Sequence, residues 1–152
     1  LNGFQTAPDA YKAMLGVQAY IDQSKLEHSL LELVKIRASQ INRCAYCLHM
    51  HIADARKAGE SEIRIALLSA WEESELFTPR ERAALRWTEE LTRASERSPS
   101  DAAYAELREH FNEKDSVDLS FAIGAINTWN RINVGFRTRH PADRPRKTEA
   151  AA

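Results

Sequence analysis

Cysteine is scarce in this chain of 152 residues, which contains only two, and neither sign of charge is in excess, because the formal net charge is −1. Acidic and basic residues are interspersed, so we expect neither nucleic acid nor a membrane surface as a partner. No apolar run approaches the roughly 20 residues that a membrane-spanning helix needs. The first residues, Leu1 to Phe4, lack the charged and then apolar layout of a secretory signal. We therefore expect a cytoplasmic protein.

Runs of alternating or β-branched residues, which would indicate strands, are also missing, whereas helical periodicity recurs along the chain. With 43% hydrophobic residues, the chain is long enough to bury a core. We expect an all-α fold, with a single helical domain of about six or seven helices over residues 1–137 and a flexible C-terminal tail over residues 138–152. The helices are expected over about 9–22, 24–42, 43–59, 62–69, 79–95, 98–112 and 113–136.

Helix start and stop signals set several of these boundaries. The segments Ser24 to Glu27 and Thr78 to Glu81 both have the spacing of a capping box, and the second also carries a proline at the first helical position. Ser98-Pro99 repeats the start signal for the next helix. Gly59 is expected to end the third helix in the left-handed conformation, which glycine adopts without strain.

The two cysteines stand close together in Cys44-Ala45-Tyr46-Cys47, and His51 follows four residues later. On a helix, positions three and four residues apart share one face, so the imidazole can reach a thiol. The spacing of the thiols also falls within the about 4.4–6.8 Å Cα separation that a disulfide tolerates. At a helix start, unpaired N–H groups and the positive end of the dipole favour thiolate over thiol. The pattern indicates redox chemistry.

Other interpretations of this cluster stay open. The cysteines could be small buried hydrophobic residues, with His51 in the core or at the surface. Alternatively, Cys44, Cys47 and His51 could bind a structural zinc ion. Glu32, His49 or a water would then complete the tetrahedral shell, although no second cysteine pair is present. In a reducing compartment, a Cys-x-x-Cys pair is more often a metal ligand set or a working thiol couple than a structural disulfide. His49 faces elsewhere on an ideal helix and is expected at the surface or in packing.

By spacing alone, Glu32 belongs to a solvated helix face, near Lys35 or Arg37. However, eleven residues separate it from Cys44, and the segment LLELVKIRASQINRCAYCLHMHIADARKAG continues with Cys44-x-x-Cys47-x-x-x-His51. This segment resembles the core of the alkylhydroperoxidase AhpD-like family, part of the carboxymuconolactone decarboxylase superfamily. The resemblance continues through WNRINV on the last predicted helix and covers about residues 10–137.

The resemblance implies an all-helical fold, assembly into trimers or hexamers, and thiol peroxidase activity. It also implies that the family's redox couple and proton relay correspond here to Glu32, Cys44, Cys47 and His51. Tyr46 stands where the alkylhydroperoxidase itself has a further histidine. The cysteine pair argues against lactone chemistry, because the superfamily's decarboxylase branch is understood to lack it.

We therefore predict a thiol-dependent peroxidase of the peroxiredoxin type that reduces organic hydroperoxides. Cys47 attacks the hydroperoxide and His51, held by Glu32, takes its proton. Cys44 then closes the disulfide. The two cysteines could exchange roles, because Cys44 lies at the helix start. The alternatives are a general thiol-disulfide oxidoreductase and a non-enzymatic metal-binding helical module.

The partners follow from the same chemistry. We expect a small-molecule hydroperoxide as substrate, no cofactor and no metal. The reductant is expected to be an unidentified dithiol or a protein, because the chain has no Gly-rich dinucleotide fingerprint.

The last predicted helix carries apolar residues on more than one side, so we expect it to supply core residues and to contact another subunit of a homo-oligomer. Its apolar stripe comprises Leu119, Ala122, Ile123, Ile126, Trp129, Ile132 and Val134. Trp129, Asn130 and Arg131 are expected to approach the thiols in that assembly, or to cap or pair at an interface. Trp71 and Trp87 are expected to pack in the core.

Overall fold

The computed structural model describes residues 1–140, and within them it consists of helices and their connections, with no strand. In chain order the elements are α1 (Gly3–Thr6), α2 (Pro8–Asp22), α3 (His28–Ile41), α4 (Ala45–Lys57), α5 (Glu62–Leu67), the 3₁₀ helix η1 (Leu68–Glu73), α6 (Pro79–Thr92), α7 (Asp101–His110) and α8 (Glu113–Gly135). The predicted all-α fold is confirmed. The described residues add two short elements that the sequence signals did not predict, α1 and η1. Residues 141–152 of the predicted tail lie outside the described residues.

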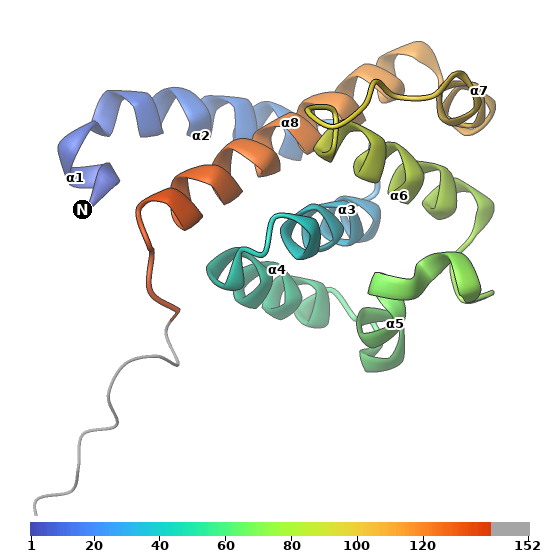
Figure 1. Cartoon of the computed structure of the whole chain (residues 1–152), viewed down its shortest axis with the longest axis horizontal. Helices are drawn as coiled ribbons and strands as arrows, with labels where there is room; N and C mark the ends of the chain where they lie inside the picture. Colours follow the sequence, from blue (N-terminus) through green and yellow to red (C-terminus); the bar gives the residue numbers. More distant parts are fainter. Residues whose placement is uncertain (141–152) are drawn as a thin grey trace, which may run out of the picture.

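Helix α3 is central in the arrangement (Figure 1), where it contacts α4, α6 and α8. Its sequence explains this position, because Leu30, Leu31, Leu33, Val34 and Ile36 point to all sides of the helix and all are buried. A helix that is apolar all round can be stable only when neighbours surround it. Helices α2 and α8 run side by side along one edge of the molecule, and α4 lies against α3.

Two hydrophobic clusters form the core, and α3 contributes to both. One cluster lies among α2, α3, α6, α7 and α8 and includes Val34, Trp87 and Ile123. The other lies among α3, α4, α5, η1 and α6 and includes Ile36 and Trp71. The predicted packing of both tryptophans is confirmed. Because each fully buried aliphatic side chain contributes about 1.5–3 kcal/mol, these contacts fix α4 against α3, where the cysteines lie.

The helix start signals were only partly right. Thr78 forms the predicted capping box with Glu81, and Pro79 occupies the first turn of α6. The prediction at Ser24 was wrong: α3 begins at His28 after an N-cap without a side-chain cap, because the backbone N–H of Ser24 closes the end of α2 on Ile21 instead. The prediction at Ser98 was also wrong, since Ser100 caps α7 by accepting from the N–H of Ala103.

Three helices end in the same turn, the Schellman motif, in which a residue in the left-handed conformation follows the helix. At the end of α4, Gly59 has the predicted left-handed conformation, with φ 90°. The same position is held by Arg43 after α3, with φ 56°, and by Arg137 after α8, with φ 54°. In each turn two backbone N–H groups return to carbonyls of the last helical turn, which satisfies groups that a helix end leaves unpaired.

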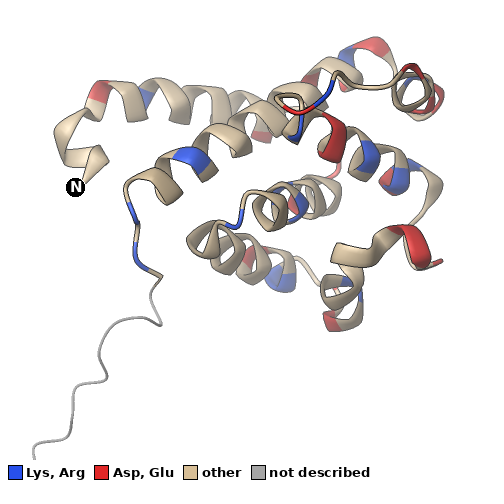
Figure 2. Ribbon diagram, in the orientation of Figure 1, with Lys and Arg blue, Asp and Glu red and all other residues tan. Residues whose placement is uncertain are grey.

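Charged residues of both signs alternate over the helices (Figure 2), and several pairs join neighbouring elements. Arg64 of α5 lies 2.6 Å from Glu81 of α6. Arg37 of α3 and the indole N–H of Trp71 both donate to Glu89 of α6. None of the helices in residues 1–140 combines the length and the apolar character that crossing a membrane requires.

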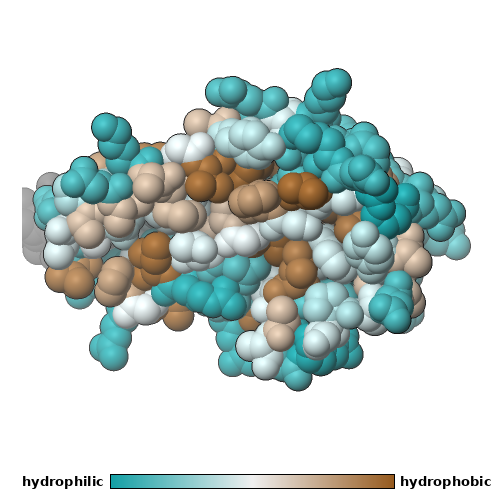
Figure 3. All heavy atoms as spheres, turned by 90° about the horizontal axis from the view of Figure 1, so that it is seen from above, coloured by the Kyte–Doolittle hydropathy of each residue, from teal (hydrophilic) through white to brown (hydrophobic). Residues whose placement is uncertain are grey.

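Apolar side chains also gather on one face of the molecule, seen from above in Figure 3. A groove of about 730 Å³ lies between α2, α6, α7 and α8, and the residues that line it include Met14, Trp87, Tyr104, Val117 and Phe121. Of these, Tyr104, Val117 and Phe121 are more than half exposed. Helix α8 therefore divides its apolar residues between the core and this open face.

The predicted core stripe of α8 is correct over its first part only. Leu119, Ala122, Ile123 and Ile126 are buried. Towards the end of the helix Trp129 and Ile132 are half-buried, and Val134 is 50% exposed and does not belong to the core. The helix extends past the core here, so its last turn has fewer neighbours.

Candidate active site

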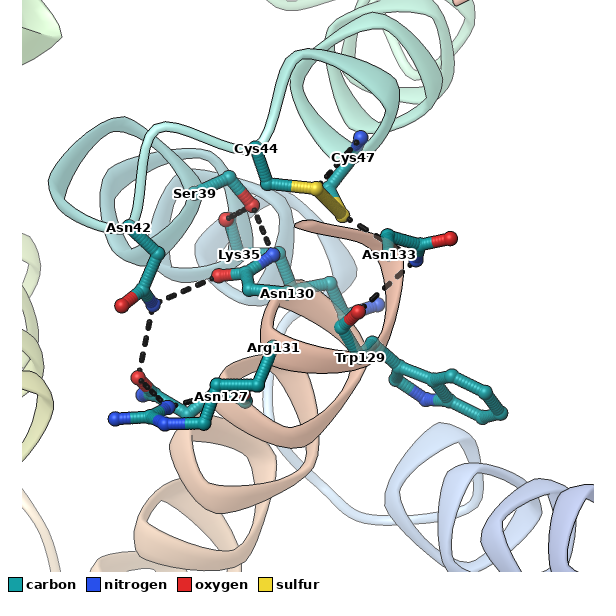
Figure 4. The surroundings of a disulfide bond; sticks show 10 residues. All are labelled: Lys35, Ser39, Asn42, Cys44, Cys47, Asn127, Trp129, Asn130, Arg131 and Asn133. Atoms are coloured by element: carbon teal, nitrogen blue, oxygen red, sulfur yellow. Dashed lines mark hydrogen bonds between the residues drawn. A yellow bond between two sulfur atoms is a disulfide. The ribbon is translucent and has the colours of Figure 1, made fainter. Parts of the chain in front are cut away.

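Cys44 and Cys47 are joined in a disulfide, with their Cα atoms 5.4 Å apart. Both are buried, each only 1% exposed. Cys44 is the N-cap of α4 and Cys47 lies in its first turn, so the cysteines bracket the start of the helix. The sulfur of Cys44 accepts the backbone N–H of Cys47 at 3.3 Å, which satisfies one N–H group at the helix start. Figure 4 shows the bond and its surroundings.

The turn between α3 and α4 determines where Cys44 lies. The N–H of Cys44 donates to the carbonyl of Ser39 at 3.0 Å, and the N–H of Arg43 donates to that of Gln40 at 3.2 Å. These two hydrogen bonds close the end of α3, and Cys44 is also the N-cap of α4. Cys44 therefore belongs to the end of one helix and the start of another, which leaves its backbone little freedom to move.

Glu32 of α3 and His51 of α4 meet across the interface between these helices. Nδ1 of His51 lies 2.9 Å from Oε2 of Glu32, and Nζ of Lys35 donates to Oε1 of Glu32 at the same distance. Glu32 is 3% exposed, Lys35 6% and His51 8%. Glu32 therefore does not lie on a solvated face, as its spacing alone would suggest. It is a buried carboxylate with a cationic partner and an imidazole.

The charge of Glu32 is stabilised by these neighbours. Burial raises the pKa of its carboxyl group, but the hydrogen bond to His51 and the charge of Lys35 outweigh burial, so the pKa is lowered overall. Glu32 is therefore ionised at neutral pH. A fixed negative charge against Nδ1 orients the imidazole, as a carboxylate does in a catalytic acid–base pair.

His51 lies one helical turn beyond Cys47 on α4, as the spacing predicts. Among the hydrogen bonds of residues 1–140, none joins the imidazole of His51 to the sulfur of Cys44 or Cys47 in this disulfide form. Because Nδ1 faces Glu32, Nε2 is the nitrogen left to exchange a proton with a thiol, directly or through a water. Glu32 and His51 thus meet at the α3–α4 interface, and His51 lies one helical turn beyond Cys47 on α4.

One residue near the sulfurs had no role in the sequence predictions. Asn133 of α8 donates from Nδ2 to the sulfur of Cys47 at 3.6 Å and to the carbonyl of Trp129 at 3.0 Å. It lies in the WNRINV segment, four residues after Trp129, so it shares a helix face with that tryptophan. That spacing places Asn133 on the same helix face as Trp129, but it does not show that this face lies against the sulfurs.

A buried polar network fixes α8 beside the cysteines (Figure 4). Asn130 is fully buried, accepts from Asn42 at 2.9 Å and donates to the hydroxyl of Ser39 at 3.0 Å. Asn42 also donates to Asn127, which accepts from Arg131. Asn130 and the carbonyl of Trp129 therefore belong to the surroundings of the disulfide within a single chain, without a second subunit.

A metal ion has two candidate ligand sets. In the disulfide form, the zinc set of Cys44, Cys47 and His51 has no thiolate to offer, because both sulfurs are bonded to each other. A second set consists of Glu32, His51 and Asp54, each offering one ligand atom within 4.8 Å of the others. Both oxygens of Glu32 are already engaged, by Lys35 and by His51. His49 points elsewhere, with its ring 4.4 Å from that of His140.

The all-helical fold of residues 1–140 is that of the AhpD-like proteins. The chain belongs to the carboxymuconolactone decarboxylase family, whose sequence profile matches residues 8–90. The matched region contains all four residues of the predicted relay.

Two of the relatives match nearly the whole chain. The uncharacterised protein YdfG of Bacillus subtilis is 42% identical over 136 residues, which cover 90% of this chain and 92% of YdfG. The crystal structure of a protein of unknown function from Agrobacterium tumefaciens, described as a candidate antioxidant defence protein AhpD, is 45% identical with a TM-score of 0.90. The match covers 93% of this chain and 97% of the Agrobacterium chain. An uncharacterised peroxidase-related protein from Silicibacter is 27% identical, with a TM-score of 0.72 over 82% of this chain and 66% of its own.

Proposed function

We propose that this chain is a thiol-dependent peroxidase that reduces organic hydroperoxides through the Cys44–Cys47 couple. The observation that carries the proposal is a disulfide at the start of α4, one helical turn before a histidine that a buried carboxylate holds. A disulfide between two cysteines three residues apart can open and close without a large change of the backbone. The adjoining Glu32–His51 pair supplies the acid and base that thiol chemistry needs.

In the first step, His51 takes the proton of the Cys47 thiol and the thiolate attacks the terminal oxygen of the hydroperoxide. A sulfur–oxygen bond forms and the oxygen–oxygen bond breaks. The leaving alkoxide takes the proton from His51 and departs as an alcohol. Cys47 is thereby oxidised to a sulfenic acid, and the hydroperoxide is reduced by two electrons.

In the second step, the thiolate of Cys44 attacks the sulfur of Cys47. The disulfide forms, and hydroxide leaves and takes up the proton that Cys44 released, giving water. A dithiol of a small molecule or of a partner protein then reduces the disulfide and is itself oxidised to a disulfide. Because backbone N–H groups at the helix start stabilise a thiolate there, Cys44 is a good leaving group when the reductant attacks Cys47.

The relatives support this class of activity. The Silicibacter protein is described as peroxidase-related and the Agrobacterium protein as a candidate for antioxidant defence. Both descriptions fit a cysteine couple that consumes peroxides.

A second function, that of a general thiol-disulfide oxidoreductase, is favoured by one specific observation. Cys44 is the N-cap of α4, and its sulfur accepts a backbone N–H at 3.3 Å. In that position a cysteine has a lowered pKa and attacks disulfides readily. Here Cys44 rather than Cys47 would form the mixed disulfide with the substrate, and no sulfenic acid would arise.

A steady-state assay distinguishes the two functions. The reduced protein is supplied with excess dithiothreitol and with tert-butyl hydroperoxide, hydrogen peroxide or a model disulfide, and the rate is compared with that of the Cys47→Ser variant. The proposal predicts turnover of the organic hydroperoxide that the variant loses. Faster turnover of the disulfide, with no consumption of hydroperoxide, would instead support the oxidoreductase. Equimolar bound zinc in the purified reduced protein, with neither activity, would support the metal-binding module.

We further propose that the chain works as a homo-oligomer, a trimer or a hexamer, in the cytoplasm. The apolar groove between α2, α6, α7 and α8, with Val117 and Phe121 more than half exposed, supports association, because a monomer gains by covering such a face. A reducing compartment supports turnover, because it supplies the thiols that reopen the disulfide.

A further inference from the structure

We propose that Asn133 stabilises the thiolate of Cys47 and thereby makes Cys47, rather than Cys44, the attacking sulfur. The inference rests on the proposed peroxidase function for its role in turnover. The interaction itself can be tested without any peroxide. The atom contacted is the one that would react, since Nδ2 of Asn133 lies 3.6 Å from the sulfur of Cys47.

The geometry of the amide decides which of its two ends faces the sulfur. The carbonyl of Trp129, 3.0 Å away, is an acceptor only, so the end of the amide that faces it must be the NH₂ group. The same NH₂ group has a second hydrogen, and the sulfur of Cys47 is its acceptor. In Figure 4 the amide nitrogen lies between the two acceptors, and the amide oxygen points away from the disulfide.

Asn133 is held from its own helix and from the turn that follows. Its backbone carbonyl accepts the N–H of Thr138 at 2.9 Å, in the turn where Arg137 is left-handed. One turn earlier, Asn130 is fully buried and bonded to Ser39 of α3. The donor is therefore in position before a thiolate forms, and it needs little reorganisation to stabilise the charge.

The two sulfurs differ in the kind of donor that each accepts. Cys44 accepts a backbone N–H, which any residue except proline at position 47 would supply. Cys47 accepts a side-chain N–H that only a few residue types at position 133 could supply. A hydrogen bond to a charged sulfur is stronger than one to a neutral thiol, so it favours the thiolate and lowers the pKa of Cys47. The helix start alone would favour the thiolate of Cys44 over that of Cys47, and the hydrogen bond from Asn133 offsets that preference.

Charged and titratable groups come from both helices that meet at the α3–α4 interface, where Cys47 lies. His51 follows on α4, and Glu32 and Lys35 come from α3. From α8, the residues that face the disulfide are uncharged, since Arg131 turns towards Asn127. A substitution of Asn133 therefore changes the donor to the sulfur and leaves the ionisable neighbours in place.

The experiment measures the pKa of Cys47 in a Cys44→Ala background, where Cys47 is the sole cysteine. The rate of alkylation by iodoacetamide is followed against pH by mass spectrometry. Asn133→Asp keeps the shape and replaces the donor by a carboxylate, and Asn133→Leu removes the donor altogether. We expect the pKa of Cys47 to rise by about one unit in the leucine variant, a tenfold smaller thiolate fraction near pH 7. We expect a larger rise in the aspartate variant, because a negative charge then faces the sulfur.

The matched control is Thr128→Val, which removes an exposed hydroxyl of α8 whose partner is the carbonyl of Gly124. It should leave the pKa of Cys47 unchanged. The thermal midpoint of each variant is measured in parallel, because a merely structural role of Asn133 would lower the midpoint without moving the pKa. Unchanged pKa values in both folded Asn133 variants would overturn the proposal. Absence of hydroperoxide turnover by the parent protein would overturn the proposed function, while the pKa comparison would still decide what Asn133 does.

Discussion

Nδ1 of His51 and Oε2 of Glu32 lie 2.9 Å apart across the interface of α3 and α4, and both residues are buried. The contact couples the helix that carries the cysteines to the central helix of the fold. Because Lys35 binds the other oxygen of Glu32, the carboxylate has a cation and an imidazole as partners in a buried site. Its removal should therefore affect stability as well as chemistry.

Glu32→Gln should lower the free energy of unfolding by about 3 kcal/mol, because it leaves the buried ammonium of Lys35 without a counter-ion. Urea denaturation at pH 7 measures the change. The matched control is Glu62→Gln, which breaks an exposed pair with Arg56 and should cost far less, because solvent screens that pair. Adding Lys35→Met to Glu32→Gln should recover part of the loss. Equal losses of unfolding free energy in Glu32→Gln and Glu62→Gln would contradict the account of Glu32 and Lys35 as a buried pair.

The lowered pKa of Glu32 predicts how its contribution depends on pH. In the folded protein the pKa of this carboxyl group lies below its ordinary value of 4.5. The ionised form of Glu32 therefore stabilises the fold at a pH above that ordinary value. The contribution is lost as the pH falls through the lowered pKa. The difference in unfolding free energy between the parent and Glu32→Gln should thus shrink as the pH falls below about pH 4.5. A difference that grows on acidification would contradict the direction of the shift.

The buried state of Glu32 could not be read from spacing within its helix. Periodicity identifies Leu30, Leu31 and Val34 as core residues, but α3 is enclosed on all sides, so Glu32 and Lys35 are buried as well. Only the resemblance to a family singled out the carboxylate. The cysteine and histidine positions could be predicted, because they depend on the spacing within one helix. Asn133 could not be predicted in the same way, because its contact depends on how α8 packs against α4.

Arg43→Gly should raise the free energy of unfolding by about 1 kcal/mol, because Arg43 holds a left-handed conformation that disfavours side chains with a Cβ atom. Arg137→Gly should have an effect of the same sign, since Arg137 has the same conformation after α8. Chemical denaturation of the oxidised protein measures both. Destabilisation by Arg43→Gly would show that its side chain contributes more than its backbone conformation costs.

The same turns show what local signals can predict. Gly59 marks the end of α4 because glycine is the residue type that this conformation favours, whereas Arg43 and Arg137 give no such signal. At helix starts, Thr78 was predicted correctly because its partner Glu81 lies three residues on and both bonds form. Ser24 has the same spacing to Glu27, but its backbone N–H donates to the carbonyl of Ile21 at the end of α2. Local patterns therefore predict boundaries only where no neighbouring element competes for the same groups.

Cys44→Ser should trap the first intermediate of the proposed reaction. With no second thiol to close the disulfide, one equivalent of tert-butyl hydroperoxide should leave a sulfenic acid on Cys47. Labelling with dimedone followed by peptide mapping locates it. Cys47→Ser should give no label on Cys44 under the same conditions. A label on Cys44 in that variant, formed as fast as the label on Cys47, would assign the attack to the other sulfur.

Hydroperoxide titration of the fully reduced protein, without any other thiol, tests the central claim most directly. The remaining free thiols are counted and the remaining hydroperoxide is measured after each addition. The account predicts that one equivalent of tert-butyl hydroperoxide is consumed for each pair of thiols lost, and that peptide mapping finds Cys44 linked to Cys47. Thiols that stay free while the hydroperoxide stays intact would contradict it.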